Sequence, residues 1–248
     1  MSSKAVRERR GVFLVEGPQA VREAVAQPGR VTEILATPQA GLRHPDVKLA
    51  AGTAGIAWHE VDPDALASVA ETVHSQGLLA IARLLDPDPA QVWSDAPRLV
   101  AGLCEVRDPG NAGTVIRCAD AAGADAVALL GASVDPHNGK CVRASAGSLF
   151  HLPVLTGASV SAGVAAARRA GIQVLGADGG GAVTLGDPGL RLQRPTLWLF
   201  GQEAAGLSAE QLALADAVVR IPLYGRAESL NLAAAAVLCL YASAAAHR

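Results

Sequence analysis

The sequence predicts an α/β protein made of two units, a small N-terminal α/β layer and a larger unit with a mostly parallel sheet. Short apolar runs alternate with helical patterns along the chain, which is typical of strands joined by helices. Half of the 248 residues are hydrophobic but only 3 % are aromatic, so small aliphatic side chains must fill the core. A chain of this length can form one large domain or two modest ones, and a proline-rich stretch after residue 85 favours two.

Four strands are expected in the N-terminal unit, at residues 13–16, 31–36, 56–61 and 78–84. Helices are expected at 19–26, where Val21, Ala24 and Val25 share one face, and at 64–71 behind a capping sequence that begins at Asp62. The turn His74-Ser75-Gln76-Gly77 leads into the fourth strand. The first ten residues form a basic arm, either a solvated tail or a phosphate contact.

Residues 85–97 have the composition of a linker, with Asp86-Pro-Asp-Pro89 followed by polar residues. In residues 98–248, strands are expected at 99–105, 126–130, 173–176, 197–200 and 218–223, and helices at 112–122, 160–170, 208–218 and 230–246. Ser208 and Gln211 form a capping box at the start of the third of these helices. Because strands alternate with helices, this sheet should be parallel and covered on both faces.

Composition restricts the possible functions. The net charge of −2 gives no global basic field, so any RNA must bind through a few local cations, and the scarcity of aromatics argues against base stacking as the main binding device. The four cysteines form no C-x-x-C pair and the histidines have no ligand spacing, so no metal is expected and a reduced, cytoplasmic protein is favoured. No signal peptide is expected, and residues 230–246 are too short and alanine-rich to favour a membrane span over a packed helix.

A ligand site is predicted where an apolar run ends on Gly201 and is followed by Gln202, Glu203 and Gly206. In parallel sheets, ligands bind at the carboxyl ends of strands. Glu203 lies between two glycines after a strand, which is hard to explain structurally and favours a functional role. Ser229 and Asn231 precede the last helix and are interpreted either as its caps or as site residues.

Two further stretches carry candidate polar groups. Asn111 is interpreted either as the cap of the helix at 112–122 or as a site residue. Arg117 on that helix either forms a surface ion pair with Asp120 or Asp125 or binds a phosphate. Residues 135–147 include Lys140 and Arg143 and have two interpretations. They either line a groove that binds a polyanion or form a turn followed by a surface helix. The glycine-rich stretch 176–181 lacks the spacing of a dinucleotide motif, which leaves a tight loop beside a ligand as the alternative.

Three of these stretches together resemble the ordered motifs of the SpoU (TrmH) branch of the SPOUT RNA methyltransferases. The motifs are Asn111-x-Gly113-x-x-x-Arg117, Leu199-Phe-Gly201-Gln-Glu203-x-x-Gly206-Leu207, and Ile221-Pro222-x-x-Gly225 through Ser229-Leu230-Asn231. Residues 1–84, with Gly11-x-Phe13-x-Val15-Glu16-Gly17-Pro18 and His74-x-Gln76-Gly77, are similar to the L30e-like substrate-binding domain of many members. The resemblance places the methyltransferase domain at 98–248.

The resemblance implies transfer of a methyl group from S-adenosylmethionine to a ribose 2′-hydroxyl in RNA, a homodimer, and a deep C-terminal trefoil knot that forms the cofactor pocket. Arg117 would engage the phosphate and hydroxyl of the target, Asn111, Ser229 and Asn231 would hold that geometry, and Glu203 would support the cofactor or Arg117. The cofactor residues are expected to be Ala177, Gly201, Ile221, Leu223 and Leu230, and the RNA-binding residues Arg107, Lys140, Arg143 and Arg226.

Ribosomal RNA is the favoured substrate, since the N-terminal domain is typical of enzymes that act on it. The alternatives are a transfer RNA methyltransferase, a non-catalytic RNA-binding or ribosome-assembly module, and a nucleotide-binding Rossmann enzyme with a dinucleotide at 176–181. Intact Asn111, Arg117, Glu203 and Asn231 argue against the non-catalytic module.

Overall fold

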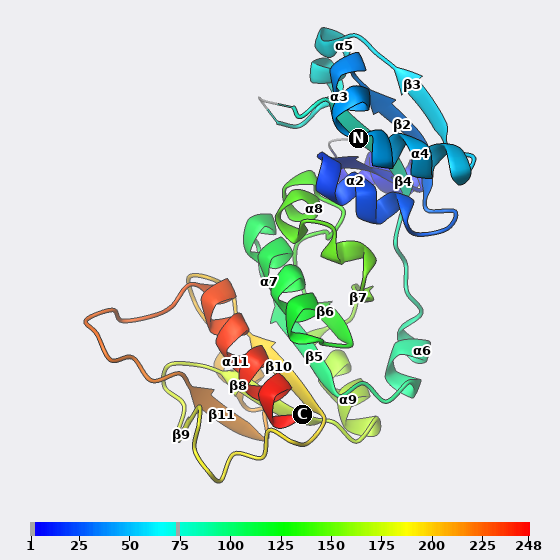
Figure 1. Cartoon of the computed structure of the whole chain (residues 1–248). Helices are drawn as coiled ribbons and strands as arrows, with labels where there is room; N and C mark the ends of the chain where they lie inside the picture. Colours follow the sequence, from blue (N-terminus) through cyan, green and yellow to red (C-terminus); the bar gives the residue numbers. More distant parts are fainter. Residues whose placement is uncertain (1–2, 73–74) are drawn as a thin grey trace.

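The computed structural model describes residues 3–72 and 75–248, so the turn residue His74 lies outside the described residues. The chain forms a four-stranded sheet followed by a seven-stranded sheet, and the smaller unit sits on the end of the larger one that carries helix α8 (Gly139–Ser145) (Figure 1). Both the α/β class and the mostly parallel C-terminal sheet are therefore confirmed.

The N-terminal sheet has the strand order β1-β4-β2-β3. Its strands are β1 (Val12–Glu16), β2 (Val31–Ala36), β3 (Ala57–Glu60) and β4 (Leu78–Arg83), close to the expected ranges. Strand β4 is antiparallel to β1 and β2, and β2 is parallel to β3. Two of its helices, α2 (Pro18–Val25) and α5 (Pro63–Val69), were expected, whereas α3 (Pro38–Arg43) and α4 (Pro45–Thr53) were not.

The basic N-terminal arm is not a solvated tail. Residues Lys4–Arg10 form helix α1, capped by Ser3, and the Arg7 side chain is only 5 % exposed. Its guanidinium donates to Asp135 Oδ2 at 2.6 Å through Nη2 and at 3.1 Å through Nε. Burial alone would raise the pKa of Asp135, but hydrogen bonds from His137 and Arg7 hold it well below its usual range. The arm thus fastens the N-terminus to the larger unit.

The C-terminal sheet has the order β7-β6-β5-β10-β8-β11-β9, and every pairing in it is parallel. The strands are β5 (Leu99–Cys104), β6 (Ala126–Leu130), β7 (Val154–Leu155), β8 (Gln173–Ala177), β9 (Val183–Thr184), β10 (Thr196–Phe200) and β11 (Ala217–Arg220). Side chains of the central strand β10 alternate between two apolar layers, with Trp198 and Phe200 in one and Leu197 and Leu199 in the other. This alternation explains why the strand is apolar throughout.

Helices cover both faces of this sheet. They are α7 (Pro109–Ala122), α9 (Val160–Arg169), α10 (Ala209–Leu212) and α11 (Leu232–Ala246), besides α8. The expected helix at 208–218 is wrong in length, because the Ser208–Gln211 capping box opens a single turn and the chain returns to the sheet at Ala217. The linker also contains a short helix, α6 (Pro89–Ser94), capped by Asp88. No helix in the described ranges is long and apolar enough to cross a membrane.

Candidate active site

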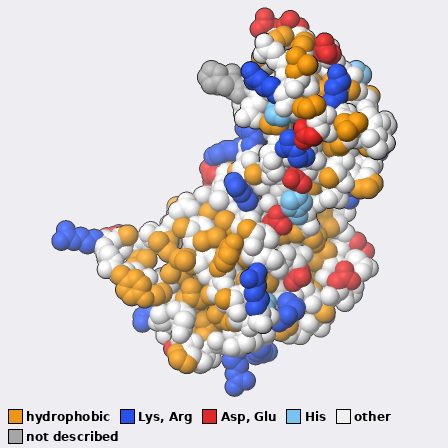
Figure 2. Space-filling view, viewed as in Figure 1, with side chains coloured by type: hydrophobic (Ala, Val, Ile, Leu, Met, Phe, Trp, Pro, Cys, Tyr) orange, Lys and Arg blue, Asp and Glu red, His pale blue; other side chains and the backbone are white. Residues whose placement is uncertain are grey.

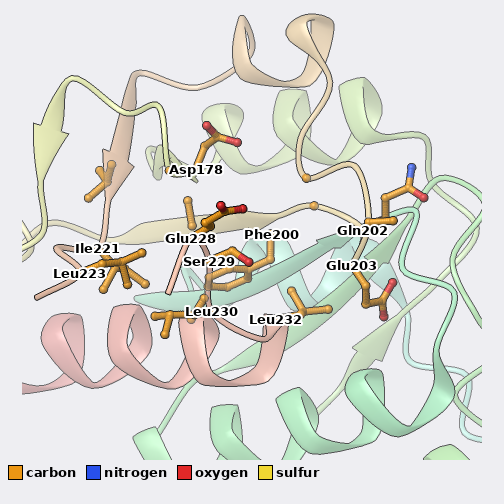
Figure 3. Close-up of a pocket in the computed structure, with 17 residues that line it drawn as sticks. Asp178, Phe200, Gln202, Glu203, Ile221, Leu223, Glu228, Ser229, Leu230 and Leu232 are labelled. Atoms are coloured by element: carbon orange, nitrogen blue, oxygen red, sulfur yellow. The ribbon is translucent and has the colours of Figure 1, made fainter. Parts of the chain in front are cut away.

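A cavity of about 280 Å³ lies at the carboxyl ends of β8, β10 and β11, where the chain leaves the sheet (Figure 3). All five residues expected to hold the cofactor line it, and so do Glu203 and Ser229. Ile221 and Leu223 lie at one end of the cavity, and Gln202 and Glu203 lie at the other. The expected cofactor residues are Ala177, Gly201, Ile221, Leu223 and Leu230.

Gly201 is required by the way the chain turns at the end of β10. A Cβ atom at this position would collide with the backbone of Gly206 and Leu207, because the loop folds back and forms a bridge between Gln202 and Gly206. Gly206 itself has a positive φ of 66°, a conformation that favours glycine. The two glycines therefore let the loop 202–206 close over the end of the strand, and the loop forms one wall of the cavity.

The lining combines apolar residues with acidic groups. Phe200, Ile221 and Leu232 are among its apolar residues, and the carboxylates of Asp178 and Glu228 also line it (Figure 3). Such a lining suits a ligand that has an aromatic ring and cationic groups. Asp178 belongs to the glycine-rich stretch 176–181, and Ala177, Asp178 and Gly179 of that stretch line the cavity.

A polar junction joins the three separated motifs beside this cavity. The Asn111 side chain donates to Glu203 Oε1 at 3.0 Å, and its oxygen accepts from Asn231 Nδ2 at 3.2 Å. The backbone N–H of Asp108 also donates to Glu203 Oε1, at 3.3 Å. Asn231 in addition caps α11, accepting from the N–H of Ala233 at 2.9 Å, so its capping and junction roles coexist. These three residues belong to motifs that are far apart in the sequence, and the structure brings them together.

Asn111 is not the helix cap that the sequence suggested. Asp108 is the N-cap of α7, with Pro109 as the first helical residue, and Asn111 follows at the third position. The Asp108 carboxylate accepts from the N–H of Asn111 at 2.9 Å and from Lys140 Nζ at 2.7 Å. The hydrogen bond from Lys140 is the main cause of the lowered pKa of Asp108. The Asp108-Pro109 pair is the sequence signal for this cap, since aspartate favours the N-cap and proline the first helical position.

Arg117 lies on the exposed side of α7 and is not among the residues that line the cavity. The alternative, an ion pair between Arg117 and Asp120 or Asp125, is absent from the described residues. Asp120 pairs with His151, and Asp125 accepts from the backbone N–H groups of Arg98 and Leu99. Within the described residues of one chain, the Arg117 side chain is therefore exposed and has no carboxylate partner.

The four other expected RNA-binding cations divide into two pairs. Arg143 is held between the two units by Glu16 at 3.4 Å and Glu71 at 3.5 Å, and Lys140 is paired with Asp108. Arg107 and Arg226 are exposed and pair with no carboxylate among the residues described. The structure thus leaves two of the four cations free to meet a phosphate, and Arg143 instead joins the units.

The described residues support neither a reactive cysteine nor a metal site. Burial raises the pKa of Cys104, Cys141 and Cys239 to about 12, so these thiols are poor nucleophiles. No group of three or more His, Cys, Asp or Glu side chains in the described residues is placed to hold a metal ion.

Comparisons with known proteins agree with this geometry. A model of the SpoU rRNA Methylase family matches residues 98–241, and a model of the MRM3-like substrate binding domain matches residues 1–80. The chain is 35 % identical to the 23S rRNA (guanosine(2553)-2'-O)-methyltransferase RlmP of Bacillus subtilis, over 97 % of this chain and 92 % of that protein.

Two solved structures extend the comparison. The SpoU methyltransferase AviRb from Streptomyces viridochromogenes, in complex with AdoMet, superposes with a TM-score of 0.83 and 32 % identity, covering 98 % of this chain and 93 % of that one. An AdoMet-bound rRNA methyltransferase from Sinorhizobium meliloti gives a TM-score of 0.80 and 29 % identity, over 98 % and 90 % of the two chains. The family model covers more than half of the chain and RlmP aligns with almost all of it, and we conclude that the protein belongs to the SpoU rRNA methylase family.

Proposed function

We propose that this protein transfers a methyl group from S-adenosylmethionine to a ribose 2′-hydroxyl in ribosomal RNA. The observation that carries the proposal is the polar junction of Asn111, Glu203 and Asn231 beside the cavity at the end of β10. S-adenosylmethionine fits the lining, because its adenine suits the apolar residues and its sulfonium and ammonium groups suit the carboxylates of Asp178 and Glu228. Relatives named as 23S rRNA 2'-O-methyltransferases support the substrate class.

The bound cofactor supplies an already activated methyl group, so the protein's task is mostly to position the hydroxyl. The loop 202–206 and the segment around Ile221 and Leu230 would hold the adenosyl group, largely through backbone atoms. Glu203 is fixed by Asn111 and by the N–H of Asp108, so the wall of the cavity keeps its shape when a ligand enters. Ser229, which also lines the cavity, would help to hold the target.

Arg117 would bind the phosphate and hydroxyl of the target nucleotide. A guanidinium is protonated at any physiological pH, so Arg117 orients and neutralises charge and does not act as a base. In a homodimer, the exposed Arg117 of one protomer would complete the cavity of its partner. The apolar side chains of Leu238 and Tyr241 on α11, 44 % and 50 % exposed, favour such an interface.

The two units of the chain would have different tasks. Residues 1–84 would bind the RNA substrate, 85–97 would link the units, and 98–248 would carry out methyl transfer. Threading of the C-terminal segment through a trefoil knot stays a prediction, as does action in the cytoplasm. A transfer RNA substrate is the alternative within the same chemistry.

The proposal is tested by mapping ribose methylation in RNA from cells with and without this gene. One ribosomal RNA nucleotide should lose its 2′-O-methyl group, and the wild-type gene should restore it. A gene encoding the Arg117→Ala variant should fail to restore it, although the purified variant binds S-adenosylmethionine normally. Restoration by that variant would refute the role of Arg117. If the wild-type protein binds no S-adenosylmethionine, the non-catalytic RNA-binding alternative is favoured.

A further inference from the structure

Tyr224 is an unusual aromatic residue in this protein. Its side chain is 95 % exposed, whereas Phe13, Phe200 and Trp198 are buried in the core and the other tyrosine, Tyr241, is half-buried. The Tyr224 hydroxyl has no hydrogen-bond partner among the described residues, and its ring contacts no other aromatic ring there. Packing within the described chain therefore does not account for this large ring in water.

Tyr224 directly follows a residue that lines the cavity proposed to hold S-adenosylmethionine. Residues 221–231 form an irregular segment between β11 and α11, which projects from the body of the larger unit (Figure 1). Leu223, immediately before Tyr224, lines the cavity, as do Glu228 and Ser229 later in the same segment. In the same view, hydrophobic and basic side chains gather on this projection (Figure 2).

The two residues that follow Tyr224 are also open to solvent. Gly225 follows it, and a Cβ atom there would meet nothing within 4 Å. Arg226 comes next, exposed and without a carboxylate partner among the residues described. An exposed ring, an open glycine and a free cation in succession offer stacking and a phosphate contact, the two devices that proteins use on unpaired RNA.

We propose that Tyr224 stacks on an RNA base beside the ribose that receives the methyl group. The inference rests on the proposed function, since it needs RNA at this cavity. Stacking is tolerant of base identity, so Tyr224 would position the strand and not read its sequence. The low aromatic content argues against stacking as the main binding device of the whole protein, but a single ring at the reacting nucleotide suffices for positioning.

The test compares Tyr224→Ala, Tyr224→Leu and Tyr224→Phe with the wild type. The RNA probe is ribosomal RNA isolated from cells that lack this gene. Loss of one aromatic stack should lower kcat/KM for the RNA about 5- to 150-fold in the Ala variant. The Leu variant, apolar but without a π-face, should be similarly impaired, and Phe should restore activity. Affinity for S-adenosylmethionine, measured by titration calorimetry, should stay within about twofold in all three.

Three other outcomes would overturn the stacking role of Tyr224, and each has a different meaning. If Tyr224→Ala methylates RNA like the wild type, or Tyr224→Leu like Tyr224→Phe, no stacking occurs. If Tyr224→Ala turns a dimer into a monomer in sedimentation velocity, the ring packs against a second copy. If the wild type itself methylates no RNA, the proposed function fails, and this inference fails with it.

Discussion

Replacing Asn111 with Asp should break the polar junction and leave helix α7 in place. In the wild type, the amide donates to Glu203 Oε1 at 3.0 Å and accepts from Asn231 Nδ2 at 3.2 Å. Aspartate keeps the accepting oxygen but turns the donor into a second carboxylate oxygen that faces Glu203. The variant therefore loses one hydrogen bond and gains a repulsion between like charges.

The free-energy cost of the Asn111→Asp substitution can be worked out from the distance between the two side chains. Two unit charges at 3.0 Å repel by about 1.4 kcal/mol in water and by about 5.5 kcal/mol at an effective dielectric constant of 20. Loss of a hydrogen bond to a charged acceptor adds about 1.5–3 kcal/mol in a buried setting. Because Glu203 is exposed and Asn111 only half-buried, solvent screening brings the total to about 2–3 kcal/mol.

A second substitution tests this reasoning. Adding Glu203→Gln to Asn111→Asp lets the new amide donate to the new carboxylate, so the hydrogen bond returns with its direction reversed. A double-mutant cycle on the S-adenosylmethionine binding free energy and on the thermal midpoint should give a coupling of about 2 kcal/mol. If the double variant is no better than Asn111→Asp, with coupling below about 0.5 kcal/mol, the junction does not support the cavity.

Three further predictions concern other parts of the molecule. Hydrogen bonds from His151 to Asp120 and Glu23 raise the pKa of His151. The stability that they add is therefore complete below about pH 6.5 and is lost as the pH rises through the raised pKa. Thermal melting curves of His151→Gln, measured across this pH range, should lack this loss. Arg7→Ala leaves a mostly buried carboxylate without its guanidinium and should cost about 3–5 kcal/mol in urea unfolding, whereas Lys4→Ala on the same helix should cost almost nothing, and equal effects would contradict this. Gly201→Ala should abolish S-adenosylmethionine binding because its Cβ meets the returning loop, whereas Gly225→Ala, in open space, should retain it in calorimetry.

The strands could be predicted from the sequence because they are short apolar runs bounded by turn residues. In the C-terminal sheet, β5, β6, β8 and β10 match their expected ranges to within a residue, whereas β11 ends three residues before the expected 223. The two-residue strands β7 and β9 were not predicted, because two residues are too few to show a pattern. Helices α3 and α4 were missed because few of their residues are buried, only Val47 and Ala51 in α4, so no apolar stripe marks them. The prolines at their first positions were the available signal.

Contacts between distant segments could not be predicted in this way. The burial of Arg7 depends on Asp135, which lies 128 residues away, and local charge pattern alone suggested a tail. Asn111 and Asn231 are 120 residues apart and meet because helix α11, which Asn231 caps, packs against α7. Asn111 reaches Glu203 because β5 and β10, the strands before them, are neighbours in the sheet. The resemblance to the SpoU motifs grouped Asn111, Glu203 and Asn231 in one site, whereas the local pattern could not show that Asn111 bonds to both of the others.

The most direct test of the central claim is the chemical position of the transferred methyl group. Purified protein would be incubated with S-adenosylmethionine that carries a labelled methyl group and with ribosomal RNA from cells lacking the gene. The RNA is then digested to nucleosides, which are analysed by mass spectrometry. We predict a single labelled product with the methyl group on the ribose 2′-oxygen. A methyl group on a base, or no labelled nucleoside, would contradict the account.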